Sequence, residues 1–179
     1  MSRPLIPQGG DDRVYTPDEL AYAIVKHFEP GGSVLEPCEG GGAFTRAFRM
    51  YNQRSDSFLR PVCAFDIDGD TSVDFLNMQS CGAAGIPTQF DWLITNPPWS
   101  LFRQFLKRSM QVADNVVFLV TLNHFFTKAR MRDVEEAGFG YREALLVDTP
   151  PKPWPSSGFQ VGAVHLVRGW EGPMKFSRL

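Results

Sequence analysis

Residues 33–44 read SVLEPCEGGGAF, a short apolar strand followed by an acid, a glycine cluster and the first residues of a helix. The glycines at 40, 41 and 42 allow backbone conformations that a Cβ atom would forbid, so the main chain can approach a ligand closely. The helix that follows offers free N–H groups and a partial positive charge at its first turn. The glycine spacing differs from the dinucleotide pattern G-x-G-x-x-G, and a plain tight turn is the alternative interpretation. This stretch predicts a strand–turn–helix unit that can hold a cofactor.

A helix is predicted directly upstream of this unit. Thr16 is placed as its N-cap, Pro17 at its first position and Glu19 as the acid that closes a capping box. Apolar residues then recur at helical spacing as far as Phe28, and Pro30 with the two glycines after it ends the segment.

Strands and helices alternate along the rest of the chain, which is typical of a doubly wound parallel sheet. Strands are predicted at 62–67, 73–76, 90–95, 116–122, 141–148 and 161–170, and helices at 43–50, 100–110 (with Ser100 as N-cap) and 128–137. The last two strands are joined by a Pro-rich loop too short for a helical crossover, which predicts an antiparallel hairpin at one edge. The predicted fold class is α/β: a three-layer α/β/α sandwich with a Rossmann-like, mostly parallel seven-stranded sheet. Residues 1–14 are predicted to be a flexible arm and residues 15–179 a single domain.

The composition is that of an ordinary globular protein, with 43% hydrophobic and 21% charged residues. No apolar run approaches the roughly 18 residues of a membrane span. The first residues lack the apolar core of a signal peptide, so we expect a cytoplasmic protein that does not enter a membrane. The three cysteines show no C-x-x-C spacing, and no metal site is expected.

The net charge of −2 excludes a generally basic nucleic-acid binder, but it hides an asymmetry. Residues 1–100 hold 7 Lys and Arg against 13 Asp and Glu, whereas residues 101–179 hold 11 against 7. If the two halves form different rims of one site, one rim suits a polyanion. An ordinary solvated surface with uneven charge explains the same counts equally well.

Two acidic stretches, FDID (65–68) and VDFL (73–76), follow the glycine unit. In open α/β sheets, ligands bind beyond the carboxyl ends of the strands, and an acid at such an end can accept both hydroxyl hydrogens of a ribose. Asp66 is the candidate for that role, Ile67 offers an apolar face to an adenine ring, and Asp74 can accept a hydrogen from the adenine amine. Each acid alone is as consistent with a cap or turn. Together with the glycine turn they favour a nucleoside ligand.

The tetrapeptide Asn96-Pro97-Pro98-Trp99 follows the apolar strand 90–95 and is the most specific signal in the chain. Two prolines stiffen the backbone and remove two donors, so nearby carbonyl groups remain as acceptors. The Asn96 side chain and the Pro97 carbonyl can accept the two hydrogens of an amino group, which aims the nitrogen lone pair at an electrophile. Trp99 supplies a flat face for a planar group that bears the amine. The alternative is a rigid turn that ends the strand.

These motifs resemble those of the class I S-adenosylmethionine-dependent methyltransferases, and within them the N6-adenine type. EPCEGGGAF resembles the D-P-x-x-G-x-G-x-F motif, with Glu36 in the acid position. FDID and VDFL are similar to the ribose- and adenine-contacting motifs, and NPPW to the [DN]-PP-[YFW] catalytic motif. RVYTPDEL (13–20) is similar to the R-V-x-T-P-x-E segment of γ-class DNA adenine methyltransferases, in which the cofactor motif precedes the catalytic one, as here. The resemblance spans about residues 13 to 168 and fits small phage or mobile-element forms.

The resemblance implies S-adenosylmethionine as cofactor, S-adenosylhomocysteine as product, and direct in-line methyl transfer to the N6 amine of adenine. The implied contacts to the methionine end are Tyr15, Thr16, Pro17, Glu36, Pro37, Gly40 and Gly42, with Asn96 beside them; those to the ribose and adenine are Asp66, Ile67, Asp74 and Phe75. The implied catalytic residues are Asn96, Pro97, Pro98 and Trp99. A target base in a duplex would have to be flipped out of the helix.

The sequence departs from the family in two places. The connection from FDID to VDFL is too short for the usual helix, so we expect an adenine pocket that is partly open or covered differently. No target-recognition domain is visible, because only about ten residues follow the last predicted strand. Substrate contacts are therefore expected from the N-terminal arm, from residues 123–130 and from the loop 149–160.

The last two segments combine basic and aromatic residues, which suit phosphates and stacked bases. The candidates for substrate binding are Trp99, Lys128, Arg130, Trp154 and Phe159, with Lys152 nearby. Phe125 and Phe126 are equally consistent with buried core residues. Trp154 is the stronger candidate, because its loop is rich in proline.

DNA is the expected partner, with a monomer or a homodimer both possible. The same catalytic motif serves RNA adenine methyltransferases. A protein glutamine N5-methyltransferase would also use an N-P-P motif, and a non-catalytic S-adenosylmethionine-binding subunit is a further alternative. The sequence leaves the substrate, its sequence preference and the oligomeric state open.

Overall fold

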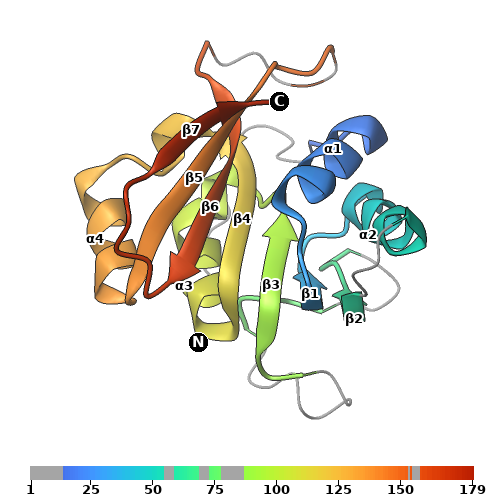
Figure 1. Cartoon of the computed structure of the whole chain (residues 1–179), viewed down its shortest axis with the longest axis horizontal. Coiled ribbons are helices and arrows are strands. Elements are labelled where there is room, and N and C mark those ends of the chain that lie inside the picture. The colour runs from blue at the N-terminus through green and yellow to red at the C-terminus, as the bar shows by residue number, and fades with distance from the viewer. Residues whose placement is uncertain (1–13, 55–58, 69–72, 78–86, 153, 155–157) are drawn as a thin grey trace.

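The computed structural model describes residues 14–54, 59–68, 73–77, 87–152, 154 and 158–179. These residues form one seven-stranded sheet between two layers of helices (Figure 1), in the strand order β2-β1-β3-β4-β6-β5-β7. The strands are β1 (Gly32–Glu36), β2 (Leu59–Ala64), β3 (Phe90–Thr95), β4 (Ala113–Thr121), β5 (Phe139–Val147), β6 (Val161–Arg168) and β7 (Lys175–Arg178). The helices are α1 (Asp18–Phe28), α2 (Ala43–Arg54), α3 (Phe102–Val112) and α4 (Lys128–Glu136), with 3-10 turns η2 (Trp99–Leu101) and η3 (Leu122–His124).

The sheet is parallel except at β6, which runs antiparallel to both β4 and β5. Strand order reverses at β1, because the chain passes first to β2 on one side and then to β3 on the other. Such a reversal places a crevice at the carboxyl ends of the strands, where ligands of doubly wound folds bind. The predicted three-layer α/β fold is confirmed.

Alternate residues of the central strands supply two separate cores. Val34, Ile94 and Val117 pack with α1 and α2 on one face of the sheet. Their neighbours Leu35, Leu93 and Val116 point the other way and pack with α3 and α4. Successive side chains of a strand face opposite sides, so a strand buried on both faces reads as a continuous apolar run. This explains why FDWLIT and VVFLVTL are apolar throughout.

Two predictions about the sheet are wrong. Residues 73–76 form a turn instead of a strand, because the Asp74 carboxylate accepts the main-chain N–H groups of Leu76 (3.0 Å) and Asn77 (3.4 Å). The seventh strand is β7, which pairs in parallel with β5. It is short and mostly exposed, so no apolar pattern marks it in the sequence. The β5–β6 hairpin is antiparallel as expected, but β7 and not the hairpin forms that edge.

Helix starts also differ from the prediction by one or two residues. Pro17, with no side-chain cap, occupies the N-cap of α1, and Thr16 lies outside the helix. Leu101 occupies the N-cap of α3, because Ser100 lies inside the preceding 3-10 turn. The helix at 128–137 is confirmed: Thr127 caps α4 through the Arg130 N–H, and Gly138 follows it with a φ of 73°. Within the described residues, no helix is long and apolar enough to cross a membrane.

Candidate active site

The candidate site lies at the carboxyl edge of the sheet, the upper edge in Figure 1. Because β1, β2, β3 and β4 are parallel, the segments that follow them meet there. Two groups of residues are named here after the roles that the sequence predicts for their motifs. Glu36, which ends β1, is grouped with Gly40–Gly42 and Asp66, which follow β1 and β2, as the cofactor end. We call Asn96, Trp99, His124 and Trp154 the target end, since they follow β3, β4 and β5.

The glycine turn is held to the segment after β2 by main-chain and carboxylate hydrogen bonds. Glu39 N–H donates to the Phe65 carbonyl at 3.0 Å, and Gly40 N–H donates to the Asp66 carboxylate at 2.8 Å. Gly40 and Gly42 have φ values of 49° and 77°, a region that L side chains rarely adopt. The sequence thus needs glycine at both positions to close this turn onto the acid.

Glu36 is buried at the end of β1, with 1% of its surface exposed. Its Oε1 accepts the Cys38 N–H at 2.9 Å and the Thr95 hydroxyl at 2.5 Å. Burial raises the pKa of Glu36 to about 8, against the lowering effect of these two hydrogen bonds. Glu36 therefore connects the glycine turn to β3 through hydrogen bonds, and its carboxyl group is mostly protonated near neutral pH.

Of the residues predicted for the ribose and adenine, Asp66 is bonded to the glycine turn and Ile67 follows it directly, whereas Asp74 and Phe75 make other contacts. Asp66 also accepts the Asp68 N–H at 3.0 Å, and Ile67 is 61% exposed, so its apolar side chain is open to a ligand. Asp74 lies in its own turn, as described above. The Phe75 ring is buried against Phe65 and Phe105, with centroids 6.3 and 5.5 Å away. Its side chain is a core residue and offers no open face to adenine.

The segment before α1 lies over both ends of the site. The Tyr15 ring contacts the glycine turn closely enough that a Cβ built on Gly41 would meet it at 3.3 Å. Arg46 of α2 pairs with Asp18 at 2.5 Å and donates to the Gly41 carbonyl at 2.7 Å. Val14 is half-buried and packs against the core, and residues 1–13, the rest of the predicted arm, lie outside the described residues.

Asn96 is bonded through only one side of its amide. Its Nδ2 donates to the Val14 carbonyl at 2.8 Å and lies 3.3 Å from the Thr16 hydroxyl. Its Oδ1 is buried and has no hydrogen-bond partner among the described residues. Pro97, the next residue, is buried as well. The site therefore holds an acceptor that nothing in the described chain satisfies.

Trp99 lies between aromatic rings from the segments that follow two other strands. Its ring centroid lies 5.6 Å from His124, which follows β4, and 6.3 Å edge-on from Trp154, which follows β5. Trp154 is 5% exposed, so it supports Trp99 from behind and is not the open stacking face that its Pro-rich loop suggested. The indole N–H groups of Trp99 and Trp154 are buried and without a partner in the described part of the chain.

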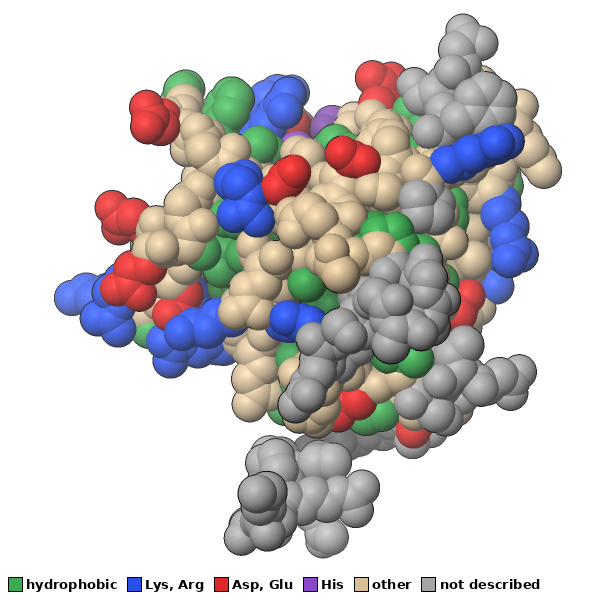
Figure 2. All heavy atoms as spheres, turned by 90° about the horizontal axis from the view of Figure 1, so that it is seen from below, with side chains coloured by type: hydrophobic (Ala, Val, Ile, Leu, Met, Phe, Trp, Pro, Cys, Tyr) green, Lys and Arg blue, Asp and Glu red, His purple; other side chains and the backbone are tan. Residues whose placement is uncertain are grey.

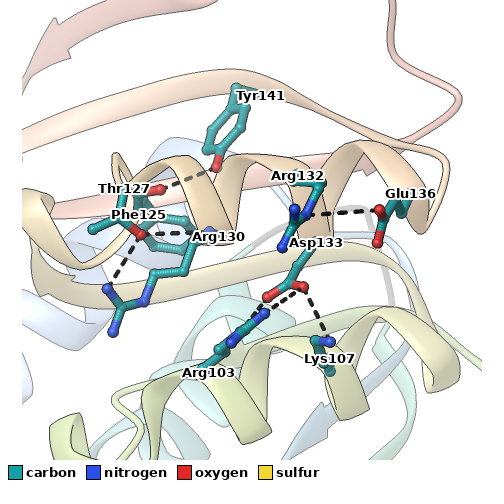
Figure 3. Close-up of polar contacts among 9 residues, drawn as sticks. All are labelled: Arg103, Lys107, Phe125, Thr127, Arg130, Arg132, Asp133, Glu136 and Tyr141. Atoms are coloured by element: carbon teal, nitrogen blue, oxygen red, sulfur yellow. Dashed lines mark hydrogen bonds and ion pairs between the residues drawn. The ribbon is translucent and has the colours of Figure 1, made fainter.

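The other predicted substrate residues are divided between surface and core. Lys128, Lys152 and Phe159 are exposed, the last by 57%. Phe125 is fully buried, and the Tyr141 hydroxyl donates to its carbonyl at 3.3 Å (Figure 3). Phe126 is 40% exposed. Arg130 is held locally, because its guanidinium lies 5.5 Å above the Phe102 ring and donates to Thr127 at 3.3 Å.

Two of the three basic residues of α3 are engaged with α4. Arg103 and Lys107 both bind Asp133, at 2.5 and 3.0 Å (Figure 3). The hydrogen bond from Arg103 has the largest effect on the pKa of the buried Asp133 carboxyl. Together with the bond from Lys107 it lowers this pKa to about 2. On the face seen from below, Lys and Arg side chains lie beside Asp and Glu (Figure 2). Part of the positive charge counted in residues 101–179 is thus neutralised locally.

The sequence did not reveal three participants. The His124 ring lies beside the Trp99 ring, the Thr95 hydroxyl donates to Glu36, and the Val14 carbonyl accepts from Asn96. The position of Thr95 directly before Asn96 was a usable signal, because it ends a strand that neighbours β1. The described residues contain no group of three His, Cys, Asp or Glu side chains arranged to bind a metal.

Comparison with solved structures identifies the fold. A Listeria monocytogenes protein assigned to the class I S-adenosylmethionine-dependent methyltransferases superposes with a TM-score of 0.69 and 13% identity, over 96% of this chain and 68% of that one. A Pyrococcus horikoshii protein assigned as an RNA methyltransferase gives 0.58 and 15%, over 87% and 83%. A Vibrio vulnificus protein assigned as a type I restriction modification subunit gives 0.60 and 15%, over 92% of this chain and 46% of that one.

No protein-family model matches the sequence, and no curated protein matches it. The identities to the solved structures are low, so the similarity concerns the fold. The sheet order, the parallel core and the glycine turn at the strand reversal agree with it. The chain has the fold of the class I methyltransferases.

Proposed function

We propose that this protein is an S-adenosylmethionine-dependent N-methyltransferase that acts on the N6 amine of adenine, with DNA as the substrate. The observation that carries the proposal is the buried, unpartnered Oδ1 of Asn96 in the motif NPPW, at the carboxyl edge of a class I methyltransferase sheet. A buried acceptor without a partner costs about 1–3 kcal/mol, so it calls for a donor supplied from outside. An amino group is such a donor.

The cofactor end fits S-adenosylmethionine. The positive-φ glycines leave the main chain bare where a side chain would otherwise stand, and the adjacent α2 N-terminus presents N–H groups. Asp66 retains acceptor capacity beyond its two main-chain bonds, which suits ribose hydroxyls, and exposed Ile67 suits an adenine face. We assign Tyr15, Thr16, Pro17, Glu36, Pro37, Gly40 and Gly42 to the methionine end of the cofactor.

At the target end, Asn96 Oδ1 and the Pro97 carbonyl would accept the two hydrogens of the target amine. These two hydrogen bonds would direct the nitrogen lone pair toward the cofactor end. The orientation and the fixed dipoles would accelerate methyl transfer. Bound S-adenosylmethionine would supply an electrophilic methyl group on its sulfonium. The N–CH₃ bond would form as the S–CH₃ bond breaks, and the surplus proton on nitrogen would pass to water.

A planar base is favoured as target because Trp99 is an aromatic residue that is only partly buried, with His124 and Trp154 packed against its ring. Stacking on such a ring is worth about 1–3 kcal/mol per base. The Vibrio structure, assigned to a restriction modification subunit, supports DNA, and the Pyrococcus structure, assigned to an RNA methyltransferase, makes RNA the alternative to be tested. Lys128, Arg130, Lys152 and Phe159 are proposed to contact the strand that carries the base.

The experiment incubates the full chain with radiolabelled S-adenosylmethionine and separate pools of duplex DNA, single-stranded DNA, tRNA, rRNA and protein extract. We expect N6-methyladenine in DNA, and a loss of at least about 100-fold in Asn96→Ala with cofactor affinity retained. Asn52→Ala is the matched control, because among the described residues its amide bonds the Leu59 main chain, at the opposite edge of the sheet. Label confined to RNA or protein would refute the DNA assignment, and cofactor binding without transfer to any pool would refute the enzyme assignment.

A further inference from the structure

The orientation of the Asn96 amide is set by residues from outside its own motif. The Val14 carbonyl is 2.8 Å from Asn96 Nδ2, and a carbonyl oxygen can only accept. The opposite amide orientation would place Oδ1 against that oxygen with no hydrogen between them. The Thr16 hydroxyl, at 3.3 Å, bonds the same Nδ2. Oδ1 is therefore turned away from the N-terminal segment.

The N-terminal segment that holds this amide is itself fixed to the cofactor end. Between its two contacts to Asn96 stands Tyr15, whose ring lies against the glycine turn. Its continuation, α1, is joined to α2 through Asp18 and Arg46, and Arg46 donates to the Gly41 carbonyl. A shift of the glycine turn or of Tyr15 would be transmitted to the atoms that orient Asn96.

We propose that Val14 and Thr16 are positioning residues for the methyl acceptor: they fix the Asn96 amide so that Oδ1 faces the target amine. The inference rests on the proposed function, and it gives the segment before α1 a role toward the substrate in addition to the cofactor. It also explains why the first residue of NPPW is Asn here. A carboxylate at position 96 has no N–H to give to the Val14 carbonyl.

Two substitutions at Thr16 test the positioning role. Thr16→Val keeps the shape of the side chain but removes the acceptor, and we expect kcat to fall about 3- to 10-fold. Thr16→Ser, which keeps the hydroxyl, should restore kcat to within about twofold of the wild type. kcat is measured at saturating S-adenosylmethionine, so that a change in cofactor affinity at Thr16 does not enter the comparison. A weakened cofactor affinity with unchanged kcat would overturn the proposal, because Thr16 would then act on the cofactor alone.

Asn96→Asp tests the Val14 contact. We expect transfer to fall as far as in Asn96→Ala, because the carboxylate faces a carbonyl oxygen. Retention of more than about a tenth of the wild-type rate would contradict the proposal.

A readout independent of activity separates this inference from the proposed function. The side-chain amide signal of Asn96 in a ¹⁵N spectrum is assigned by its absence in Asn96→Ala. We expect its hydrogen exchange to be slow in the wild type and in Thr16→Ser, and at least about threefold faster in Thr16→Val. Equal exchange in all three would overturn the positioning role, whatever the protein methylates.

Discussion

The cofactor end and the target end of the candidate site lie at the same edge of one sheet, yet their polar groups are satisfied differently. At the cofactor end, the carboxyl groups of Glu36 and Asp66 accept hydrogen bonds from the chain itself. At the target end, Asn96 Oδ1 and the indole N–H groups of Trp99 and Trp154 are buried and have no partner in the described residues. The first end is complete as a fold element. The second carries buried polar atoms that no described residue satisfies, and in the proposed function a ligand supplies the missing partner of Asn96.

This difference predicts which substitutions change the free energy of unfolding and which change the rate of methyl transfer. A residue whose partners are in the chain contributes to the folded state, and its loss leaves those partners unsatisfied. A residue whose partner is a ligand contributes little to folding, and its loss lowers kcat or kcat/KM instead. The following predictions test this division, from the largest expected effect to the smallest.

Glu36→Ala should reduce the free energy of unfolding by about 2–6 kcal/mol, since it leaves the Cys38 N–H and the Thr95 hydroxyl unsatisfied in a buried place. Cofactor affinity should fall at least about tenfold, because the glycine turn loses its tie to β3. Urea denaturation and calorimetric titration measure both. Glu39→Ala, at the partly exposed neighbour, is the control, and equal losses in the two variants would break the comparison.

Trp99→Ala should lower kcat/KM about 5- to 150-fold, the equivalent of about 1–3 kcal/mol of lost stacking. Cofactor affinity should remain within about twofold, because Trp99 lies at the target end. Trp99→Phe, which keeps a flat ring, should recover most of the loss. Steady-state kinetics on an adenine-containing oligonucleotide provides the measurement, and a weakened cofactor affinity without a kinetic defect would contradict the assignment of Trp99.

The ligand-free protein should become less stable as pH rises from about 6.5 to about 8; below pH 6.5 the buried His165, whose pKa burial lowers to about 3, opposes the effect of Glu36. Burial raises the folded-state pKa of Glu36 to about 8, so the native state holds a proton that the unfolded state releases above 4.5. The contribution is complete below the unfolded value and is lost toward pH 8, with a slope of at most about 1.4 kcal/mol per pH unit. Denaturation midpoints across this range measure the slope. Glu36→Gln should flatten it, and an unchanged slope in that variant would assign the effect to another group.

Asp18→Asn should change the free energy of unfolding by no more than about 1 kcal/mol, because its pair with Arg46 is exposed on both sides. The effect should shrink further in high salt. Thermal denaturation at low and high ionic strength provides the measurement. A loss of several kcal/mol would show that the link between α1 and the glycine turn carries more of the fold than its exposure implies.

Much of the fold followed from local pattern. The continuous apolar runs of β3 and β4 predict strands buried on both faces, and the glycine cluster predicts a turn with positive φ. The errors arose where a side chain made a contact that periodicity does not encode. Asp74 bonds its own following main chain, and β7 is held by pairing with β5 without an apolar face.

The sequence by itself determined the alternation of strands and helices, the glycine turn and the motif NPPW, because each depends on residues close together in the chain. Only the tertiary structure decided which way the Asn96 amide points and what stands behind Trp99. Those contacts come from Val14, 82 residues away, and from loops that follow two other strands. Sheet order brings such residues to one edge, and no local pattern contains sheet order. In the proposed function NPPW supplies an acceptor for an amine, and its surroundings determine how that acceptor is presented.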